Sequence, residues 1–275
     1  MNPKTCTEIN ANITNRWSLK GKKALVTGAT KGIGLGISEE LLMLGAEICI
    51  VARSEQEINK LLQQWETKEH ICYGIAADLS TPDGRKAILE KIEALWGKDL
   101  DILINNVGTN IRKPTNELTS SEIEKIFQTN FFSTFELCRL LFPHLAKSGQ
   151  ASVVNIGSIA GSRILTTGSI YAVTKAAVDH LSRYLAVEWA HSGIRVNSVV
   201  PGYIETPLTE TALANPEFKK RVEKQTPLGR IGLPQDVAAM AAFLCLPAAS
   251  YITGTVTPVD GGFSAFSFEF LARSN

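Results

Sequence analysis

An excess of one charge sign is missing from this 275-residue chain, and so is any long hydrophobic run. Lys and Arg together number 28 and Asp and Glu 27, which gives a net charge of +1 at pH 7. A protein that binds a nucleic-acid backbone usually presents a broad basic face, so no nucleic-acid partner is expected. The longest apolar run, residues 237–249, is interrupted by Pro247 and is shorter than the ~18 residues of a membrane span. We therefore expect no membrane association.

Paired cysteines and a targeting segment are also missing. The 5 cysteines are widely spaced and include no CxxC pair, which argues against a disulfide framework and against a metal site. Residues 1–15 contain no apolar core of the kind found in secretory signal peptides. The sequence therefore predicts a cytoplasmic protein without a bound metal.

Short apolar runs alternate along the chain with longer segments of helical period. The runs that predict strands are residues 23–27, 47–51, 73–76, 102–105, 152–156 and 195–200. The segments that predict helices are residues 33–44, 55–66, 85–96, 120–146 and 169–190. Near-continuous apolar strands separated by helices are typical of a parallel sheet covered on both faces. Because no linker or internal repeat divides the chain, we expect a single doubly wound α/β domain of the Rossmann type.

A glycine-rich turn joins the first expected strand to the first expected helix. Residues 27–34 read TGATKGIG. Glycine lets the main chain turn tightly and approach a pyrophosphate closely, and the helix N-terminus offers unpaired N–H groups and a positive dipole end. The alternative, an ordinary surface turn, does not explain its place between strand and helix. The turn predicts a dinucleotide site.

The end of the second expected strand lacks the carboxylate that usually binds the adenosine ribose of NAD. The chain has Arg53 there instead, and Lys31 adds a second cation from the glycine turn. Guanidinium and ammonium groups suit a 2′-phosphate, so NADP(H) is favoured over NAD(H). The alternative is that both are ordinary surface charges.

Polar residues also follow the third and fourth expected strands. Asp78 stands where a carboxylate can accept from an adenine amino group, and helix capping is an almost equally good interpretation. Residues 105–108 (NNVG) end the fourth strand, where the crevice of a doubly wound sheet opens.

A catalytic constellation is indicated by Tyr171, Lys175 and Ser158. Tyr171 and Lys175 are four residues apart on an expected helix, so the phenol and the ammonium share one face. A free phenol has a pKa of ~10, and a neighbouring cation favours the phenolate and brings the group toward neutrality. Ser158 follows a strand and can donate to a carbonyl oxygen. Alone, such a Tyr/Lys pair is usually a solvated helix face.

From residue 17 to 262 the chain resembles the short-chain dehydrogenase/reductase family. The resemblance is carried by residues 27–34, Asp78, residues 105–108, Asn130, Ser158, Tyr171 with Lys175, residues 195–197 (RVN), Pro201 with Gly202, and residues 260–262 (DGG). It implies a seven-stranded sheet in the order 3-2-1-4-5-6-7 and a homodimer or homotetramer. The implied catalytic set is Asn130, Ser158, Tyr171 and Lys175, with Asn130 holding a proton-relaying water and with Ser158 and Tyr171 contacting substrate.

Motifs and resemblance together give a set of cofactor-binding residues for NADP(H). These are Gly28, Thr30, Lys31, Gly32, Ile33, Gly34, Arg53, Asp78, Leu79, Asn105, Val107, Gly108, Tyr171, Lys175, Pro201, Gly202, Ile204 and Thr206. Val107 departs from the alanine that is usual in the family, and its extra methyl groups are expected to shift the adenosine ribose slightly.

Within the family, residues 17–21, Trp65, residues 188–190 and residues 243–254 are similar to the tropinone-reductase-like group. The resemblance implies an NADPH-dependent ketone reductase acting on a small carbonyl or alcohol substrate. The alternatives left open are a 3-oxoacyl-carrier-protein reductase, a gluconate 5-dehydrogenase-like enzyme, and a non-catalytic NADP-sensing protein. Substrate contacts are expected from residues 109–112, 159–166, 203 and 208–213, with Ile159, Ile164 and Leu165 making the pocket partly apolar. Arg163 is able to meet an anionic group, and an ordinary surface charge is at least as good an interpretation of it.

The ends of the chain are expected to lie outside the main domain. Residues 1–16 predict a flexible N-terminal tail, residues 17–262 the catalytic domain, and residues 263–275 an aromatic C-terminal tail. The tail carries Phe263, Phe266, Phe268 and Phe270. Apolar material of this kind rarely stays solvated, so the sequence predicts that it packs at a subunit interface.

Overall fold

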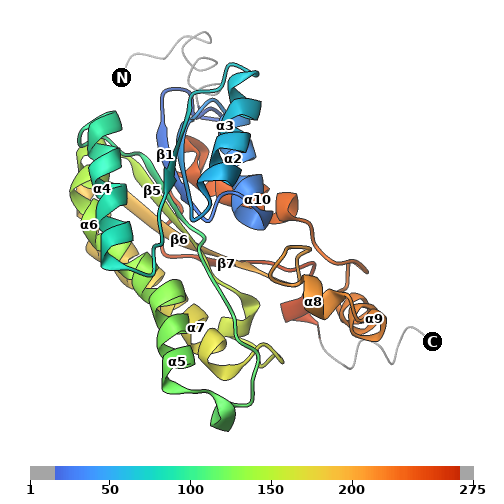
Figure 1. Ribbon diagram of the computed structural model, residues 1–275. Helices are drawn as coiled ribbons and strands as arrows, with labels where there is room; N and C mark the ends of the chain where they lie inside the picture. Colours follow the sequence, from blue (N-terminus) through green and yellow to red (C-terminus); the bar gives the residue numbers. More distant parts are fainter. Residues whose placement is uncertain (1–15, 267–275) are drawn as a thin grey trace.

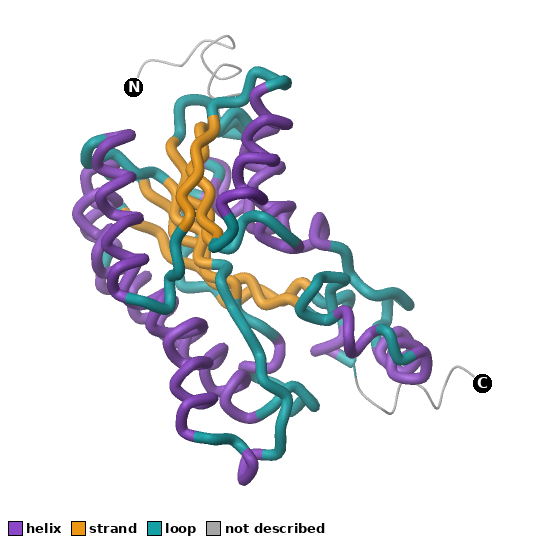
Figure 2. The backbone as a smooth tube through the Cα atoms, in the orientation of Figure 1, coloured by secondary structure: helices purple, strands orange, loops and turns teal. Residues whose placement is uncertain are grey.

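The computed structural model describes residues 16–266, and its strands form one seven-stranded sheet (Figures 1 and 2). The order across the sheet is β3-β2-β1-β4-β5-β6-β7, and every neighbouring pair is parallel. The strands are β1 (Lys23–Thr27), β2 (Glu47–Ala52), β3 (Cys72–Ala76), β4 (Ile102–Asn105), β5 (Ala151–Ile156), β6 (Ile194–Pro201) and β7 (Val256–Val259). The predicted doubly wound fold and its strand order are confirmed.

Helices cover both faces of this sheet, as Figure 1 shows. One face is packed by α2 (Gly32–Met43), α3 (Glu55–Glu66) and α10 (Pro234–Cys245), whose apolar side chains form one core cluster with the strands. The other face is packed by α4 (Pro82–Trp96), α6 (Ser133–Ser148) and α7 (Ser169–Glu188), which share a second cluster. The central strands are buried from both sides, which explains their near-continuous apolar runs.

Three short helices lie beyond these layers, near the carboxyl ends of the strands. α5 (Ser120–Phe127) leads into α6 through a π-helical turn, Gln128–Phe132. α8 (Glu210–Leu213) and α9 (Pro216–Gln225) follow β6 and stand to one side of the layered body in Figure 1. The sequence predicted a single helix over residues 120–146. In the structure the π turn divides this segment into α5 and α6. The hydrophobic pattern does not reveal the turn, because the one extra residue of a π turn changes the helical period very little.

Residues at both ends of the described chain pack against the domain. The Ala248 N–H donates to the Arg16 carbonyl at 3.0 Å, and the Trp17 ring packs on Phe243 with centroids 6.0 Å apart. Near the other end, Phe263 lies 5.7 Å from the Tyr203 ring of its own chain. Phe263 therefore packs within the subunit. Phe268 and Phe270, with the rest of the predicted tail, lie outside the described residues.

Candidate active site

The glycine turn is shaped by backbone geometry. Gly28 and Gly32 have φ values of +63° and +54°, a conformation that side chains disfavour. A Cβ atom at Gly34 would lie 2.2 Å from the Gly28 carbonyl oxygen, so no side chain fits there. The glycines are therefore required by the shape of the turn itself.

The N-terminus of α2 is left free for an anion. Its cap residue, Lys31, makes no side-chain capping bond, and no acidic residue stands in the first turn. A helix start of this kind attracts phosphate through unpaired N–H groups and the helix dipole. The Thr206 Cγ2 atom lies 3.1 Å from the Cβ position of Gly32, so the loop after β6 reaches the same turn. These features fit a pyrophosphate.

The two cations that are predicted to bind phosphate, Arg53 and Lys31, differ in their ion pairing. Arg53 is exposed just after β2 and makes no ion pair within residues 16–266. Lys31 Nζ instead lies 2.7 Å from Glu57 Oε1, and the Thr30 hydroxyl donates to Glu57 Oε2 at 3.1 Å. The hydrogen bond from Lys31 lowers the pKa of Glu57. Glu57, on α3, is a residue that sequence reasoning missed.

Asp78 lies at the carboxyl end of β3 and does not cap α4. The cap is Thr81, whose hydroxyl accepts from the Gly84 N–H at 3.1 Å. Asp78 Oδ1 accepts from the Ser80 N–H and hydroxyl, and the charge of Arg53 helps to lower its pKa. The capping interpretation is therefore wrong, and Asp78 is near Arg53 at the end of the sheet. The next residue, Leu79, has a buried side chain, and its carbonyl accepts from Arg85.

The NNVG segment after β4 is held by its asparagines. Asn105 is buried and donates to Asn155 Oδ1 at 2.8 Å, which gives its side chain a role inside the sheet. Asn106 Nδ2 donates to the carbonyls of Thr27 and Gly28, at 3.0 Å each, and so ties this segment to the glycine turn. The Val107 Cγ2 atom would lie 3.3 Å from a Cβ at Gly28. The extra methyl groups of Val107 thus face the turn.

Asn130 lies in the π turn, buried between two elements. Its Oδ1 accepts from the Thr109 N–H at 2.8 Å, and its Nδ2 donates to the Thr109 carbonyl at 3.0 Å and to Thr174 Oγ1 at 3.1 Å. π turns shift the register of backbone hydrogen bonds and are frequent at functional sites. Asn130 thereby joins the loop after β4 to α7.

The phenol of Tyr171 and the amine of Lys175 lie on one buried face of α7, as predicted. Both side chains are less than a tenth exposed, and Lys175 Nζ is 5.8 Å from the centre of the Tyr171 ring. Lys175 Nζ donates to the Ile156 carbonyl at 2.8 Å and would lie 3.4 Å from a Cβ at Gly108. Ser158 follows β5 and its Oγ accepts from the Ala160 N–H at 3.2 Å. The side chains of Tyr171, Lys175 and Ser158 therefore lie at the carboxyl ends of β4 and β5.

The pKa values of these groups are governed first by burial. Burial raises the pKa of Tyr171 above its ordinary value, and the neighbouring Ser158 hydroxyl and the charge of Arg112 oppose the rise. Burial lowers the pKa of Lys175 to about 8, and the charge of Asp179 opposes that fall. The sequence predicted that Lys175, together with the positive charge of oxidised nicotinamide, would favour the phenolate. In the protein without cofactor, the groups that lower the pKa of the phenol are Ser158 and Arg112.

Asp179 is a further buried residue that sequence reasoning missed. It stands one helical turn after Lys175 and accepts from the Ser198 hydroxyl at 2.6 Å. Burial raises its pKa, and the charges of Lys175 and Arg183 oppose this. Its spacing, i+4 from the lysine on the same helix, was a signal available in the sequence.

Residues after β6 complete the predicted cofactor set. A Cβ at Gly202 would lie 2.8 Å from Asp260 Cβ, so glycine is needed where this segment crosses the DGG sequence. Ile204 is buried and pairs with Gly232 in an isolated parallel bridge. The Thr206 N–H donates to Thr209 Oγ1 at 3.1 Å.

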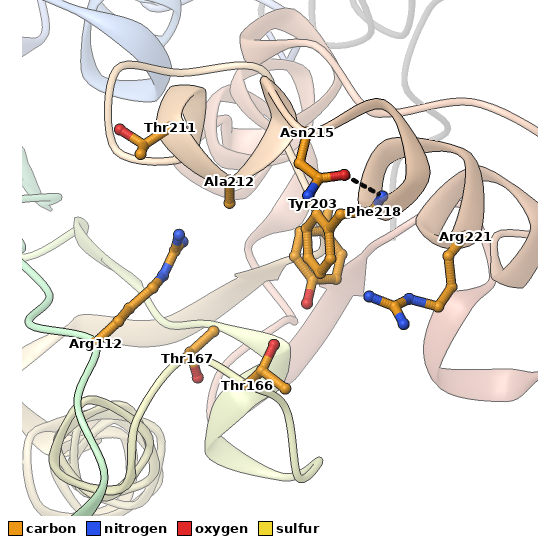
Figure 3. A pocket seen from close by; sticks show the side chains of 9 residues that line it. All are labelled: Arg112, Thr166, Thr167, Tyr203, Thr211, Ala212, Asn215, Phe218 and Arg221. Atoms are coloured by element: carbon orange, nitrogen blue, oxygen red, sulfur yellow. Dashed lines mark hydrogen bonds between the residues drawn. The ribbon is translucent and has the colours of Figure 1, made fainter.

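A pocket of about 320 Å³ lies between the loop after β4, the segment before α7, and α8 with α9 (Figure 3). Its lining residues are Arg112, Thr166, Thr167, Tyr203, Thr211, Ala212, Asn215, Phe218 and Arg221. The expected contributions from residues 112, 166, 203, 211 and 212 agree with this lining. The other expected residues lie outside this lining, and Ile164 is fully exposed. Arg163 is exposed as well, which agrees with its alternative interpretation as a surface charge. Asn215, Phe218 and Arg221 were not predicted, because α9 was not predicted.

Comparison with known proteins identifies the class. The family model described as enoyl-(acyl carrier protein) reductase matches residues 28–264. With the sheet order and the Ser158, Tyr171 and Lys175 arrangement, this places the chain in the short-chain dehydrogenase/reductase family, whose members are NAD(P)-dependent oxidoreductases. The chain belongs to this family, as the resemblance predicted.

Individual proteins within the family are also similar to this chain. A tropinone reductase homologue of Arabidopsis thaliana is 48% identical over 94% of this chain and 98% of its own length, and a second, chloroplastic one is 47% identical over 92% and 79%. Among solved structures, a gluconate 5-dehydrogenase of Burkholderia cenocepacia in complex with NADP and tartrate has a TM-score of 0.88, at 29% identity over 93% and 100% of the two chains. The RhlG/NADP active-site complex of Pseudomonas aeruginosa has a TM-score of 0.84, at 36% identity over 90% and 98%.

Within residues 16–266, no helix has both the length and the apolar character needed to cross a membrane.

Proposed function

We propose that the protein is an NADPH-dependent reductase that converts a ketone to a secondary alcohol, reversible as an alcohol dehydrogenase. The observation that carries the proposal is the buried Tyr171 and Lys175 pair on α7, beside Ser158 and facing Gly108 at the end of β4. The relatives named for tropinone reductase and the NADP complexes of similar structures support it.

The proton donor in this proposal is the phenol of Tyr171. Because burial raises its pKa, the phenol stays protonated at neutral pH, which is the state that a reduction requires. Ser158 donates a hydrogen bond to the carbonyl oxygen and stabilises the charge that develops there. Lys175, with a pKa of about 8, is mostly charged at pH 7 and binds the nicotinamide ribose. Asn130 positions the water that returns the proton.

The cofactor site fits NADP(H). The tight turn of Gly28, Gly32 and Gly34 leads into the uncapped start of α2, where the pyrophosphate binds, and Asp78 with the Leu79 N–H binds adenine. Arg53 holds the 2′-phosphate, and Lys31 contributes less because Glu57 pairs with it. Ile204 and Thr206 hold the carboxamide. When bound, the cofactor supplies the hydride.

A panel assay tests the proposal. Purified protein is mixed with NADPH and a series of ketones, with NADH alongside, and loss of the dihydronicotinamide absorbance is followed. We expect turnover with at least one ketone and a lower KM for NADPH than for NADH. Absence of turnover with every ketone, together with tight NADPH binding, would favour a non-catalytic NADP-binding protein instead.

We propose in addition that the enzyme is a homodimer or homotetramer in the cytosol. One face of α7 exposes Val173, Tyr184 and Val187, at 51%, 63% and 82% of their surfaces, and exposed apolar patches mark contact sites. Light scattering on the purified protein tests the assembly, and Val187→Glu is expected to shift it toward monomers. A fluorescent fusion tests the compartment, with plastids as the contrary outcome, since one relative is named chloroplastic.

A further inference from the structure

Two arginines without carboxylate partners line the pocket that borders the start of α7. Arg112 comes from the loop after β4 and Arg221 from α9, and Figure 3 shows the two guanidinium groups on opposite sides of Tyr203. No carboxylate lines the pocket, and neither arginine makes an ion pair within the described part of the chain. Two lysines close to them in sequence do have carboxylate partners: Lys113 pairs with Glu122 at 2.5 Å and Lys219 with Glu205 at 3.3 Å.

Aromatic packing holds one of these cations in place. The Arg221 guanidinium lies 5.5 Å from the centre of the Phe218 ring. Phe218 packs edge-on against Tyr203 at 5.6 Å, and Phe263 packs on Tyr203 at 5.7 Å. Cation–π contact orients the guanidinium and reduces the entropy it loses on binding a ligand. Arg221 is therefore held in position beside the pocket.

Both arginines line one pocket and act electrostatically on Tyr203, which lines it too. The charges of Arg112 and Arg221 each oppose the rise in the pKa of Tyr203 that burial causes. Arg112 has the same effect on Tyr171. Neutral donors complete the lining: Asn215 Oδ1 accepts the Phe218 N–H at 3.1 Å, and Figure 3 shows its amide nitrogen on the pocket side. Thr167 of the lining comes two residues before α7 begins, so the pocket borders the start of the helix that carries the phenol.

We propose that Arg112 and Arg221 bind an oxyanion of the ketone substrate, so that the preferred substrate is a small keto acid or a phosphorylated ketone. This inference rests on the proposed reductase function and specifies its substrate class. A guanidinium presents a planar fork of N–H donors that matches carboxylate and phosphate oxygens. The same charges repel a protonated amine, so a cationic ketone is disfavoured. A volume of about 320 Å³ suits a small organic acid, since drug-sized ligand pockets begin near this size.

Four ring ketones of similar size test the charge preference. They are a cyclohexanone that carries a carboxylate opposite the carbonyl, its methyl ester, a phosphate monoester of the corresponding hydroxy ketone, and an N-methyl piperidone that is protonated at neutral pH. We expect kcat/KM to be about 10- to 100-fold higher for the better of the two anions than for the ester, because a hydrogen bond to a charged group contributes a free energy of that size. The piperidone should have the lowest kcat/KM of the four. The ratio of carboxylate to phosphate distinguishes the two anions.

Variants test the assigned residues. Arg221→Met and Arg112→Met keep side-chain length and remove charge, and each is expected to reduce kcat/KM for the anionic ketone about tenfold. Arg221→Met should change kcat/KM for the ester little, whereas Arg112→Met also removes a charge that lowers the pKa of Tyr171. Lys220→Met is the matched control, because Lys220 is exposed on the same helix and does not line the pocket. Its effect on the anionic ketone should stay within about twofold.

A binding measurement separates this inference from the reductase proposal. Isothermal titration of the carboxylate and of its ester into NADP⁺-loaded protein should show tighter binding of the carboxylate, and Arg221→Met should abolish the difference. Equal binding of acid and ester overturns the inference, whether or not NADPH is oxidised. Turnover of the ester with no anion preference overturns the inference and leaves the reductase proposal standing. Tighter anion binding without turnover of any ketone supports the site and contradicts the reductase proposal.

Discussion

Replacing Gly34 with alanine should damage the nucleotide turn although alanine is the better helix former. In a helix interior the change gains about 1 kcal/mol from propensity. Here the new Cβ would lie 2.2 Å from the Gly28 carbonyl oxygen and 2.5 Å from Asn106 Nδ2. Relieving that overlap costs about 1–3 kcal/mol, and losing the bond from Asn106 to Gly28 adds about 1 kcal/mol. We expect the free energy of unfolding to fall by about 1–3 kcal/mol and NADPH to bind at least about tenfold more weakly.

Gly36→Ala is the matched control on the same helix. Its Cβ would lie 3.4 Å from Ala238 Cβ, an ordinary contact, so stability should be unchanged or higher by up to about 1 kcal/mol with unaltered NADPH affinity. Urea unfolding followed by tryptophan fluorescence and a fluorescence titration with NADPH measure both quantities. If Gly34→Ala matched Gly36→Ala in stability and in affinity, the argument from close approach would be refuted.

Three further predictions concern charge and access. Glu57→Gln frees Lys31 and removes a negative charge, so NADPH should bind a few-fold more tightly; a titration that showed the same gain for NADH would contradict this. Asp179→Asn removes the negative charge that opposes the effect of burial on Lys175, so the pKa of Lys175 should fall below about 8. The alkaline limb of the kcat/KM profile should then move to lower pH, and an unmoved limb would contradict the coupling between Asp179 and Lys175. The segment from Thr206 to Pro216 is expected to cover the nicotinamide, so saturating NADPH should slow chymotryptic cleavage at Leu208, which is 45% exposed; an unchanged cleavage rate would argue against a lid.

The features that the sequence predicted are those whose parts are close together in the chain. The glycine turn lies between two consecutive elements and the Tyr171 and Lys175 pair lies within one helix, so in both the spacing along the chain determines the geometry. The central strands were predictable because burial on both faces makes them continuously apolar. β7 was expected only through the family resemblance, because its residues are partly exposed at the sheet edge and include Pro258.

Contacts between residues that are far apart in the chain could not be predicted from the sequence. Arg112 and Arg221 converge only because the loop after β4 and α9 meet over the pocket, and one sequence does not place them. The pairing of Lys31 with Glu57 likewise joins α3 to the glycine turn. The order of influences on the Tyr171 pKa needed the fold as well, because it depends on how deeply the phenol is buried.

The most direct test of the central claim, that Tyr171 donates the proton during carbonyl reduction, is single-turnover oxidation of bound NADPH by Tyr171→Phe in the presence of a ketone that the wild type reduces. General acid catalysis contributes about 10²–10⁴-fold to such a step. The account predicts a rate lower by that factor, with NADPH affinity and unfolding free energy close to those of the wild type. A variant that reduced the ketone at close to the wild-type rate would contradict it.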